Sequence, residues 1–176
     1  MRDRICLVDD LTKDNDSRLG AIGDMNFAVD KMGVSDDLLV IGGDNLFSGT
    51  LKNFLVFAKT KKVSPVIGVY DIKSKSSASN YGVIKLDADK RIVDFQEKPA
   101  KPQSTLVAMC LYFFPKGKLG LIKKYLSSRS KKRDAMGFYI DWLRSNFPVY
   151  GYEFRGKWYD IGDYKFYNTA KKIFVG

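Results

Sequence analysis

An acidic turn follows an apolar run in the first third of the chain. Residues 38–41 read Leu-Leu-Val-Ile, and the run stops at Gly42, Gly43, Asp44 and Asn45. A strand buried on both faces reads as a continuous apolar run, and ligands of open α/β sheets lie beyond the carboxyl ends of the strands. A carboxylate there, beside glycines that let a ligand approach the backbone, suits a divalent cation and phosphates. The alternative is an ordinary Gly-Asp-Asn turn without a ligand.

A second predicted strand end, near the end of the chain, also carries an acid. Asp160 follows Trp158 and Tyr159 and precedes Ile-Gly-Asp. Mg²⁺ needs only one or two carboxylates when phosphates supply its other ligands, so Asp44 and Asp160 together could hold one Mg²⁺. Asp160 could instead cap the last helix, although Asp163 is better placed for that.

A charged pair locked by a proline ends another predicted strand, at Glu97, Lys98 and Pro99. A carboxylate can bind two adjacent sugar hydroxyls, and a Lys ammonium can hold a phosphate as a point charge. The alternative is an exposed ion pair of little energetic value. Gly82 either lets a ligand reach the backbone or simply starts a strand. Gly20, at a helix start, either lets a nucleotide base approach or belongs to an ordinary helix N-terminus.

The elements that must position these residues alternate along the chain. Hydrophobic periodicity predicts strands at residues 5–8, 38–41, 63–69, 81–86, 92–96, 105–114 and 149–154. It predicts helices at residues 19–32, 50–61, 118–126, 138–145 and 164–174, and a polar loop at 74–80. Strands that alternate with helices favour one α/β domain over residues 1–176, with a mixed, mainly parallel central sheet flanked by helices.

Composition narrows the chemistry. The chain of 176 residues has no His, which excludes Ser-His-Asp and Cys-His catalysis and most zinc sites. Cys6 and Cys110 lie within apolar runs and are expected to be reduced core residues. Together with the absence of a signal peptide or an apolar run long enough for a membrane, this predicts a cytoplasmic protein.

The net charge of +10 suits a phosphate-bearing ligand or a solvated Lys-rich surface. A nucleic-acid-binding module would need a clustered basic face, whereas these Lys and Arg residues are dispersed. Their densest cluster, residues 129–133, is predicted to be a loop. We therefore expect neither a nucleic-acid nor a membrane partner.

Five segments in order resemble one family, the sugar-phosphate nucleotidylyltransferases of the type that includes glucose-1-phosphate thymidylyltransferase. They are residues 42–45, 81–84, 95–99, 106–114 and 158–163, and residues 18–24 resemble the segment that precedes the first of them. The resemblance covers nearly the whole chain. It implies a Rossmann-like nucleotidyltransferase fold and a place in nucleotide-sugar biosynthesis. The implied reaction joins a nucleoside triphosphate and a sugar-1-phosphate into a nucleotide-sugar and releases pyrophosphate.

The resemblance also implies the catalytic and metal residues. Asp44 and Asp160 would coordinate Mg²⁺ between the nucleotide phosphates and the sugar phosphate, and Lys98 would contact the sugar phosphate. Little covalent chemistry is asked of such a protein, since positioning and charge neutralisation carry the reaction. Cys110 departs from the family pattern, in which a Gly is common, so the pocket wall is expected to be bulkier here.

Five further residues would bind the substrates. Gly82 and Glu97 would contact the sugar, and Ala108 would line its pocket. Gly20 would lie against the nucleotide base, and Asn45 would belong to the substrate site next to Asp44.

One family segment has no counterpart in residues 1–176. The family's first strand leads into a Gly-rich loop that contains an Arg and wraps the triphosphate, and the chain starts at what resembles a later strand. We therefore expect an N-terminally truncated fold with little or no transferase activity alone. A missing strand would leave an open sheet edge, which predicts a homo-oligomer. A glycosyltransferase-like domain that binds a finished nucleotide-sugar is the alternative function, although it would not need Lys98.

Overall fold

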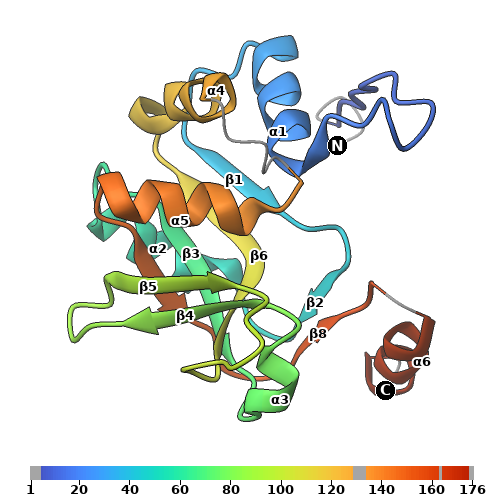
Figure 1. The fold of residues 1–176 in the computed structure, drawn as a ribbon, viewed down its shortest axis with the longest axis vertical. Helices are drawn as coiled ribbons and strands as arrows, with labels where there is room; N and C mark the ends of the chain where they lie inside the picture. Colours follow the sequence, from blue (N-terminus) through green and yellow to red (C-terminus); the bar gives the residue numbers. More distant parts are fainter. Residues whose placement is uncertain (1–4, 129–133, 163, 175–176) are drawn as a thin grey trace.

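A six-stranded sheet with helices on both faces and a separate two-stranded ribbon make up the protein (Figure 1). This computed structural model describes residues 5–128, 134–162 and 164–174. The six strands are listed here in chain order: β1 (Leu38–Ile41), β3 (Val66–Asp71), β4 (Gly82–Leu86), β5 (Ile92–Glu97), β6 (Leu106–Phe114) and β7 (Tyr150–Glu153). The ribbon pairs β2 (Asn45–Phe47) with β8 (Trp158–Asp160).

The sheet is mostly antiparallel, so the expectation of a mainly parallel sheet was wrong. Its order is β5-β4-β6-β3-β7, with β1 also paired to β6, and among the described strands only β3 and β7 are parallel neighbours. The long apolar strand β6 runs between β1 and β3 in the opposite direction. A continuous apolar run reports burial on both faces and carries no information on strand direction, which explains the error.

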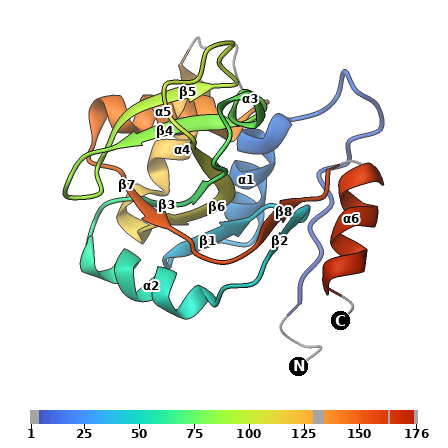
Figure 2. The same ribbon diagram turned by 90° about the horizontal axis from the view of Figure 1, so that it is seen from below.

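Each face of the sheet is covered by its own helices. One core contains α1 (Gly20–Lys31), α4 (Gly120–Ser127) and α5 (Met136–Asn146), with the 3₁₀ turn η2 (Lys116–Lys118) ahead of α4. The other contains α2 (Leu51–Thr60) and the short α3 (Lys75–Ala78), and Figure 2 shows α2 and α5 on opposite sides of the sheet. The last helix, α6 (Tyr164–Phe174), lies beside β8 (Figure 1).

The helix predictions and the hairpin of β4 and β5 are confirmed, with small shifts at the ends. Three local predictions were wrong. Residues 5–8 form no strand, and Ile5 and Leu7 are 78% and 93% exposed. Cys6 and Cys110 are solvent-exposed rather than buried in the core. Residues 75–78 of the predicted polar loop form the helix α3.

Two expectations fall on residues that the structure does not describe: the basic loop at 129–133 and the alternative cap Asp163. Within the described residues, no helix is both long and apolar enough to cross a membrane.

Candidate functional site

The β2–β8 ribbon brings the two predicted metal ligands together. Asn45 is the pairing partner of Asp160, and the Ile161 N–H donates to the Asp44 carbonyl at 2.8 Å. Both carboxylates face Gly162. A Cβ built there would lie 3.2 Å from Asp160 Oδ1 and 3.7 Å from Asp44 Oδ2. Two acids from opposite ends of the chain therefore border one small space.

Side-chain hydrogen bonds orient Asp44. Trp158 Nε1 donates to Asn45 Oδ1 at 2.8 Å, and Asn45 Nδ2 donates to Asp44 Oδ1 at 2.8 Å. A Cβ at Gly42 would lie 2.9 Å from Asn45 Nδ2 and 3.0 Å from both Asp44 Oδ1 and Cys110 Cβ. A side chain at Gly42 would therefore crowd the Asp44 carboxylate and the Asn45 amide that donates to it.

The ends of β4 and β5 form a second group of predicted residues. Gly82 pairs with Glu97, and the Lys98 N–H donates to the Tyr81 carbonyl at 3.1 Å. Lys98 has a left-handed backbone, with φ of 44°, which turns the chain directly after Glu97. A Cβ at Gly82 would lie 2.5 Å from Phe95 Cζ, so this glycine makes room for a core ring.

Glu97 packs against the first turn of α5, at Gly137. A Cβ on Gly137 would collide with the Glu97 carboxylate, so a larger residue there would force the carboxylate to move. Burial raises the pKa of Glu97, and the nearby Lys98 ammonium partly opposes that shift. The sequence reasoning missed Gly137. Its signal was a glycine beside a predicted helix start, where glycine is unfavourable without a packing reason.

The acidic pair, Asp44 and Asp160, and the carboxylate of Glu97 all lie near Cys110 of β6. Burial of the thiol is the largest cause of its raised pKa, and Asp44, Asp160 and Glu97 add to the rise through their charges. Cys110 nevertheless reaches solvent. Its residue has φ of 51°, at the place where the edge partner of β6 changes from β4 to β1. This irregular point of β6 separates the acidic pair from the end of the hairpin.

Ala108 lies two residues before Cys110 and is 9% exposed. It pairs with Val69 across β3 and belongs to the core that contains Phe95 and α5. Its small side chain therefore lies on the face of the sheet that α5 covers, the helix against which Glu97 also packs.

The donor set fits a divalent cation that takes most of its ligands from phosphates and water. Among the described residues, no group of three or more His, Cys, Asp or Glu side chains could hold a metal ion. Two carboxylates facing one space, as at Asp44 and Asp160, still suit Mg²⁺, which binds through one or two carboxylates plus substrate phosphates.

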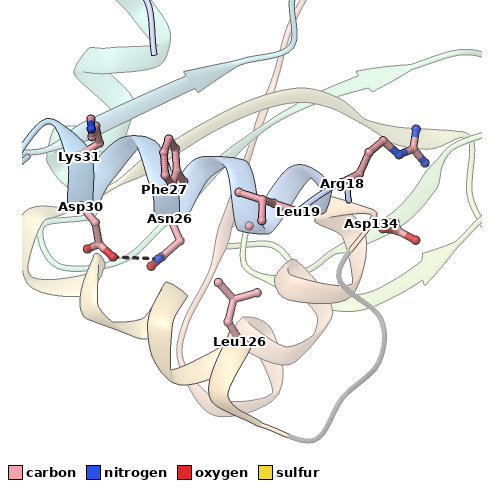
Figure 3. A pocket seen from close by; sticks show the side chains of 9 residues that line it. Arg18, Leu19, Asn26, Phe27, Asp30, Lys31, Leu126 and Asp134 are labelled. Carbon is pink, nitrogen blue, oxygen red and sulfur yellow. Dashed lines mark hydrogen bonds between the residues drawn. The ribbon is translucent and has the colours of Figure 1, made fainter. Parts of the chain in front are cut away.

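Gly20 lies apart from these groups, at the start of α1, with φ of 75°. It lines a hollow of about 250 Å³ together with Asp10, Thr12, Arg18 and Asp24, among others. The adjoining hollow, of about 730 Å³, lies between α1 and α4. Figure 3 shows Leu19 and Leu126 at its centre, with Asn26 donating to Asp30 at one end. Neither Asp44 nor Asp160 lines these two hollows.

Comparisons with known proteins bear on the family and on the fold. The sequence profile of the family described as Nucleotidyl transferase matches residues 9–174. The fold is similar to a Bacillus anthracis protein described as a glucose-1-phosphate thymidylyltransferase, in complex with sucrose. Its TM-score is 0.74 at 20% identity, over 88% of this chain and 60% of that one. It is also similar to a UDP-glucose pyrophosphorylase complexed with UDP-glucose. There the TM-score is 0.74 at 19% identity, over 89% and 62%.

Identities this low support the fold alone, and the chain spans about 60% of the length of these two proteins. The profile match, in contrast, covers nearly all 176 residues. The chain belongs to the Nucleotidyl transferase family.

Proposed function

We propose that this chain carries the sugar-phosphate and metal half of a sugar-1-phosphate nucleotidylyltransferase site. In that reaction an oxygen of the sugar phosphate attacks the α-phosphorus of a nucleoside triphosphate. A new P–O bond forms, the bond to the leaving group breaks, and pyrophosphate departs. The main support is the convergence of Asp44 and Asp160 on the space beside Gly162.

The residues of the chain would divide the work of positioning. Asp44 and Asp160 would hold Mg²⁺, which supplies charge neutralisation for the phosphates when bound. Asn45 keeps Asp44 in place through its hydrogen bond. Lys98 would contact the sugar phosphate as a point charge. The backbone turns at Lys98, directly after Glu97.

Glu97 would accept hydrogen bonds from sugar hydroxyls. Its carboxylate is held by the first turn of α5 at Gly137, and partial burial strengthens hydrogen bonds to it. Gly82 and Ala108 would shape the wall near the sugar, and Gly20 would contact the nucleotide base. We further propose that residues 1–176 alone turn over slowly, since they contain no Gly-rich, Arg-containing loop to grip a triphosphate.

Metal binding tests the acidic pair directly. Mn²⁺, a paramagnetic substitute for Mg²⁺, can be titrated into the wild type, Asp44→Asn and Asp160→Asn, with bound ion followed by electron paramagnetic resonance. Each variant is expected to weaken binding about tenfold or more, because half of the protein's anionic ligands is lost. Asp89→Asn, in an exposed turn after β4, is the matched control. Equal affinity in all four proteins would refute the metal site.

Substrate binding tests the second group. Calorimetry with glucose-1-phosphate and Mg²⁺ should show weaker binding for Lys98→Ala and Glu97→Gln than for the wild type. A pyrophosphate-release assay with several nucleotides then measures turnover. The glycosyltransferase-like alternative predicts a different result. The protein would bind a nucleotide-sugar tightly and transfer its sugar to an acceptor, and it would not bind a free sugar phosphate.

A further inference from the structure

The tryptophan that opens β8 is connected to the acidic pair through one side chain. Trp158 Nε1 donates to Asn45 Oδ1 at 2.8 Å, and Asn45 Nδ2 donates to Asp44 Oδ1 at 2.8 Å. The three residues come from the ribbon of β2 and β8 and from the turn before it (Figure 1). We propose that Trp158 is a positioning residue for the metal site, which holds Asp44 through Asn45 so that the site prefers Mg²⁺ to Ca²⁺. This inference rests on the proposed function.

The direction of the two hydrogen bonds follows from the chemistry of the three groups. An indole N–H can only donate, and an ionised carboxylate can only accept. A buried indole N–H needs an acceptor, so Trp158 holds the Asn45 amide with its oxygen toward the indole. The NH₂ group of the amide is then left on the side of Asp44. Without the indole, the amide could turn over and place its oxygen against the carboxylate.

Trp158 itself is held firmly in place. It is 9% exposed, and its ring packs against those of Tyr70 and Tyr81, with centroid distances of 5.5 and 5.3 Å. The backbone just before it is bonded to Ser48 in both directions. The Lys157 N–H donates to Ser48 Oγ at 2.8 Å, and the Ser48 N–H donates to the Lys157 carbonyl at 2.9 Å. Ring packing and backbone hydrogen bonds together therefore fix the direction of the indole N–H.

The two oxygens of Asp44 consequently point to different places. Oδ1 accepts the Asn45 hydrogen bond and would lie 3.0 Å from a Cβ at Gly42. Oδ2 would lie 3.7 Å from a Cβ at Gly162, in the space that Asp160 also borders. A cation in that space is therefore reached by one oxygen of Asp44 while Asn45 holds the other.

One oxygen from Asp44 suits Mg²⁺ better than Ca²⁺. Mg²⁺ takes an octahedral shell, keeps several waters and binds through one or two carboxylates plus phosphates. Ca²⁺ takes more oxygen ligands, in a flexible geometry, and accepts both oxygens of one carboxylate. An Asp44 released from Asn45 could rotate and offer its second oxygen. Loss of Trp158 should therefore weaken Mg²⁺ binding more than Ca²⁺ binding.

Competition against bound Mn²⁺ measures this preference. Mn²⁺ bound to the wild type, Trp158→Phe and Asn45→Ala is followed by electron paramagnetic resonance and displaced with Mg²⁺ or with Ca²⁺. In both variants Mg²⁺ affinity is expected to fall about threefold to tenfold, the usual effect of losing one hydrogen bond. The ratio of Mg²⁺ to Ca²⁺ affinity should fall about twofold or more, because Ca²⁺ can use the second oxygen. A tryptophan that only filled the core would leave this ratio unchanged, and that result would overturn the inference.

Exchange of a single group separates the hydrogen bond from the packing. The chain has two tryptophans, so Trp142→Phe leaves Trp158 alone. Growth of this variant on benzothienylalanine instead of tryptophan replaces the indole N–H by sulfur and keeps the bicyclic ring. The ratio of Mg²⁺ to Ca²⁺ affinity should fall as in Trp158→Phe, in a protein that circular dichroism shows to be folded. A ratio equal to that of Trp142→Phe grown on tryptophan would overturn the inference, even if Trp158→Phe does not fold.

A double-mutant cycle tests whether Trp158 acts through Asn45. The double variant Trp158→Phe, Asn45→Ala should lose no more Mg²⁺ affinity than Asn45→Ala alone, because the amide that carries the effect is already absent. Additive losses would overturn the path through Asn45. Trp142→Phe, on α5 in the other core, is the matched control and should bind both ions as the wild type does. The same change of ratio in this control would also overturn the inference.

The positioning role and the proposed function fail in different ways. A wild type that binds no Mn²⁺ would refute the metal site, and the inference with it. If the wild type binds Mn²⁺ and Asp44→Asn weakens it, the metal site stands. An unchanged ratio in both Trp158 replacements would then refute only the positioning role of Trp158.

Discussion

At the scale of single residues, burial of the Glu97 carboxylate makes the stability of the protein depend on pH. Its folded pKa lies above the ordinary value of 4.5 because burial disfavours the carboxylate. The folded state therefore holds the proton more tightly than the unfolded state does. Its contribution to stability is present below pH 4.5 and is lost as the pH rises through the folded pKa.

Glu97→Gln tests this sign. The variant should gain free energy of unfolding relative to the wild type at pH 7 and gain less at pH 4, while its affinity for glucose-1-phosphate falls about tenfold. Urea unfolding at the two pH values measures the first effect, with Asp89→Asn as the control. The same stability difference at both pH values would show that Glu97 is not desolvated.

Cys110 has a left-handed backbone, a conformation that favours glycine. At φ of 51° a side chain is strained, whereas glycine is not. Cys110→Gly should raise the free energy of unfolding by about 0.5–1 kcal/mol. Cys110→Ser, which keeps a Cβ, should show no such gain. Thermal denaturation compares the two, and destabilisation by Cys110→Gly alone would contradict the strain argument.

At the scale of elements, a small polar cluster ties the end of β3 to the start of β6. Thr105 Oγ1 donates to Asp71 Oδ1 at 2.6 Å, next to the paired residues Asp71 and Leu106. Hydrogen bonds from Lys73 and then Thr105 lower the Asp71 pKa to about 2. Stability from this cluster is thus present above pH 3.8 and is lost as the pH falls through about 2.

Thr105→Val should lower the free energy of unfolding by about 1 kcal/mol at pH 7. The loss should shrink toward pH 2, because the protonated Asp71 no longer gains from an extra donor. Chemical denaturation over this pH range is the measurement. Thr60→Val is a matched control, since the Thr60 hydroxyl bonds only to the Phe57 carbonyl within α2. If Thr105→Val lowers the free energy of unfolding by the same amount at every pH, Thr105 does not stabilise the ionised form of Asp71.

At the scale of the whole molecule, β1 is open on one side. Its only partner within the described residues is β6, although all four of its residues are apolar and Ile41 is 43% exposed. Open apolar edges invite pairing with another chain. We propose that residues 1–176 self-associate in solution through this edge.

Light scattering across a range of concentrations should therefore give a mass above that of one 20.0 kDa chain. Ile41→Lys should shift the equilibrium toward the monomer, because a charge on an edge strand opposes pairing. Val56→Lys, at a 58% exposed site on α2, is the control. A strict monomer at high concentration would rule the proposal out.

Features that depend on the pattern of neighbouring residues could be predicted from the sequence. Helical periodicity placed α1, α2 and α5, the polar turn between two β-forming segments placed the hairpin of β4 and β5, and motif order identified the family. Each acid, Asp44 and Asp160, was also located by the apolar or aromatic run before it. Each helix, hairpin and acid was marked by about ten neighbouring residues, and motif order needed only the sequence, so no long-range contact was needed to find them.

Features that depend on contacts between distant parts of the chain could be seen only in the folded structure. The direction of β6 was hidden because burial on both faces leaves the same apolar run in parallel and antiparallel sheets. The strands β2 and β8 are three residues each and exist because they pair with each other, Asn45 with Asp160 and Phe47 with Trp158. The same pairing brings the two acids close together, and the fit of Glu97 against Gly137 appears only when α5 packs on β5. Local sequence was enough to name candidate residues, but only the fold shows which of them lie close together.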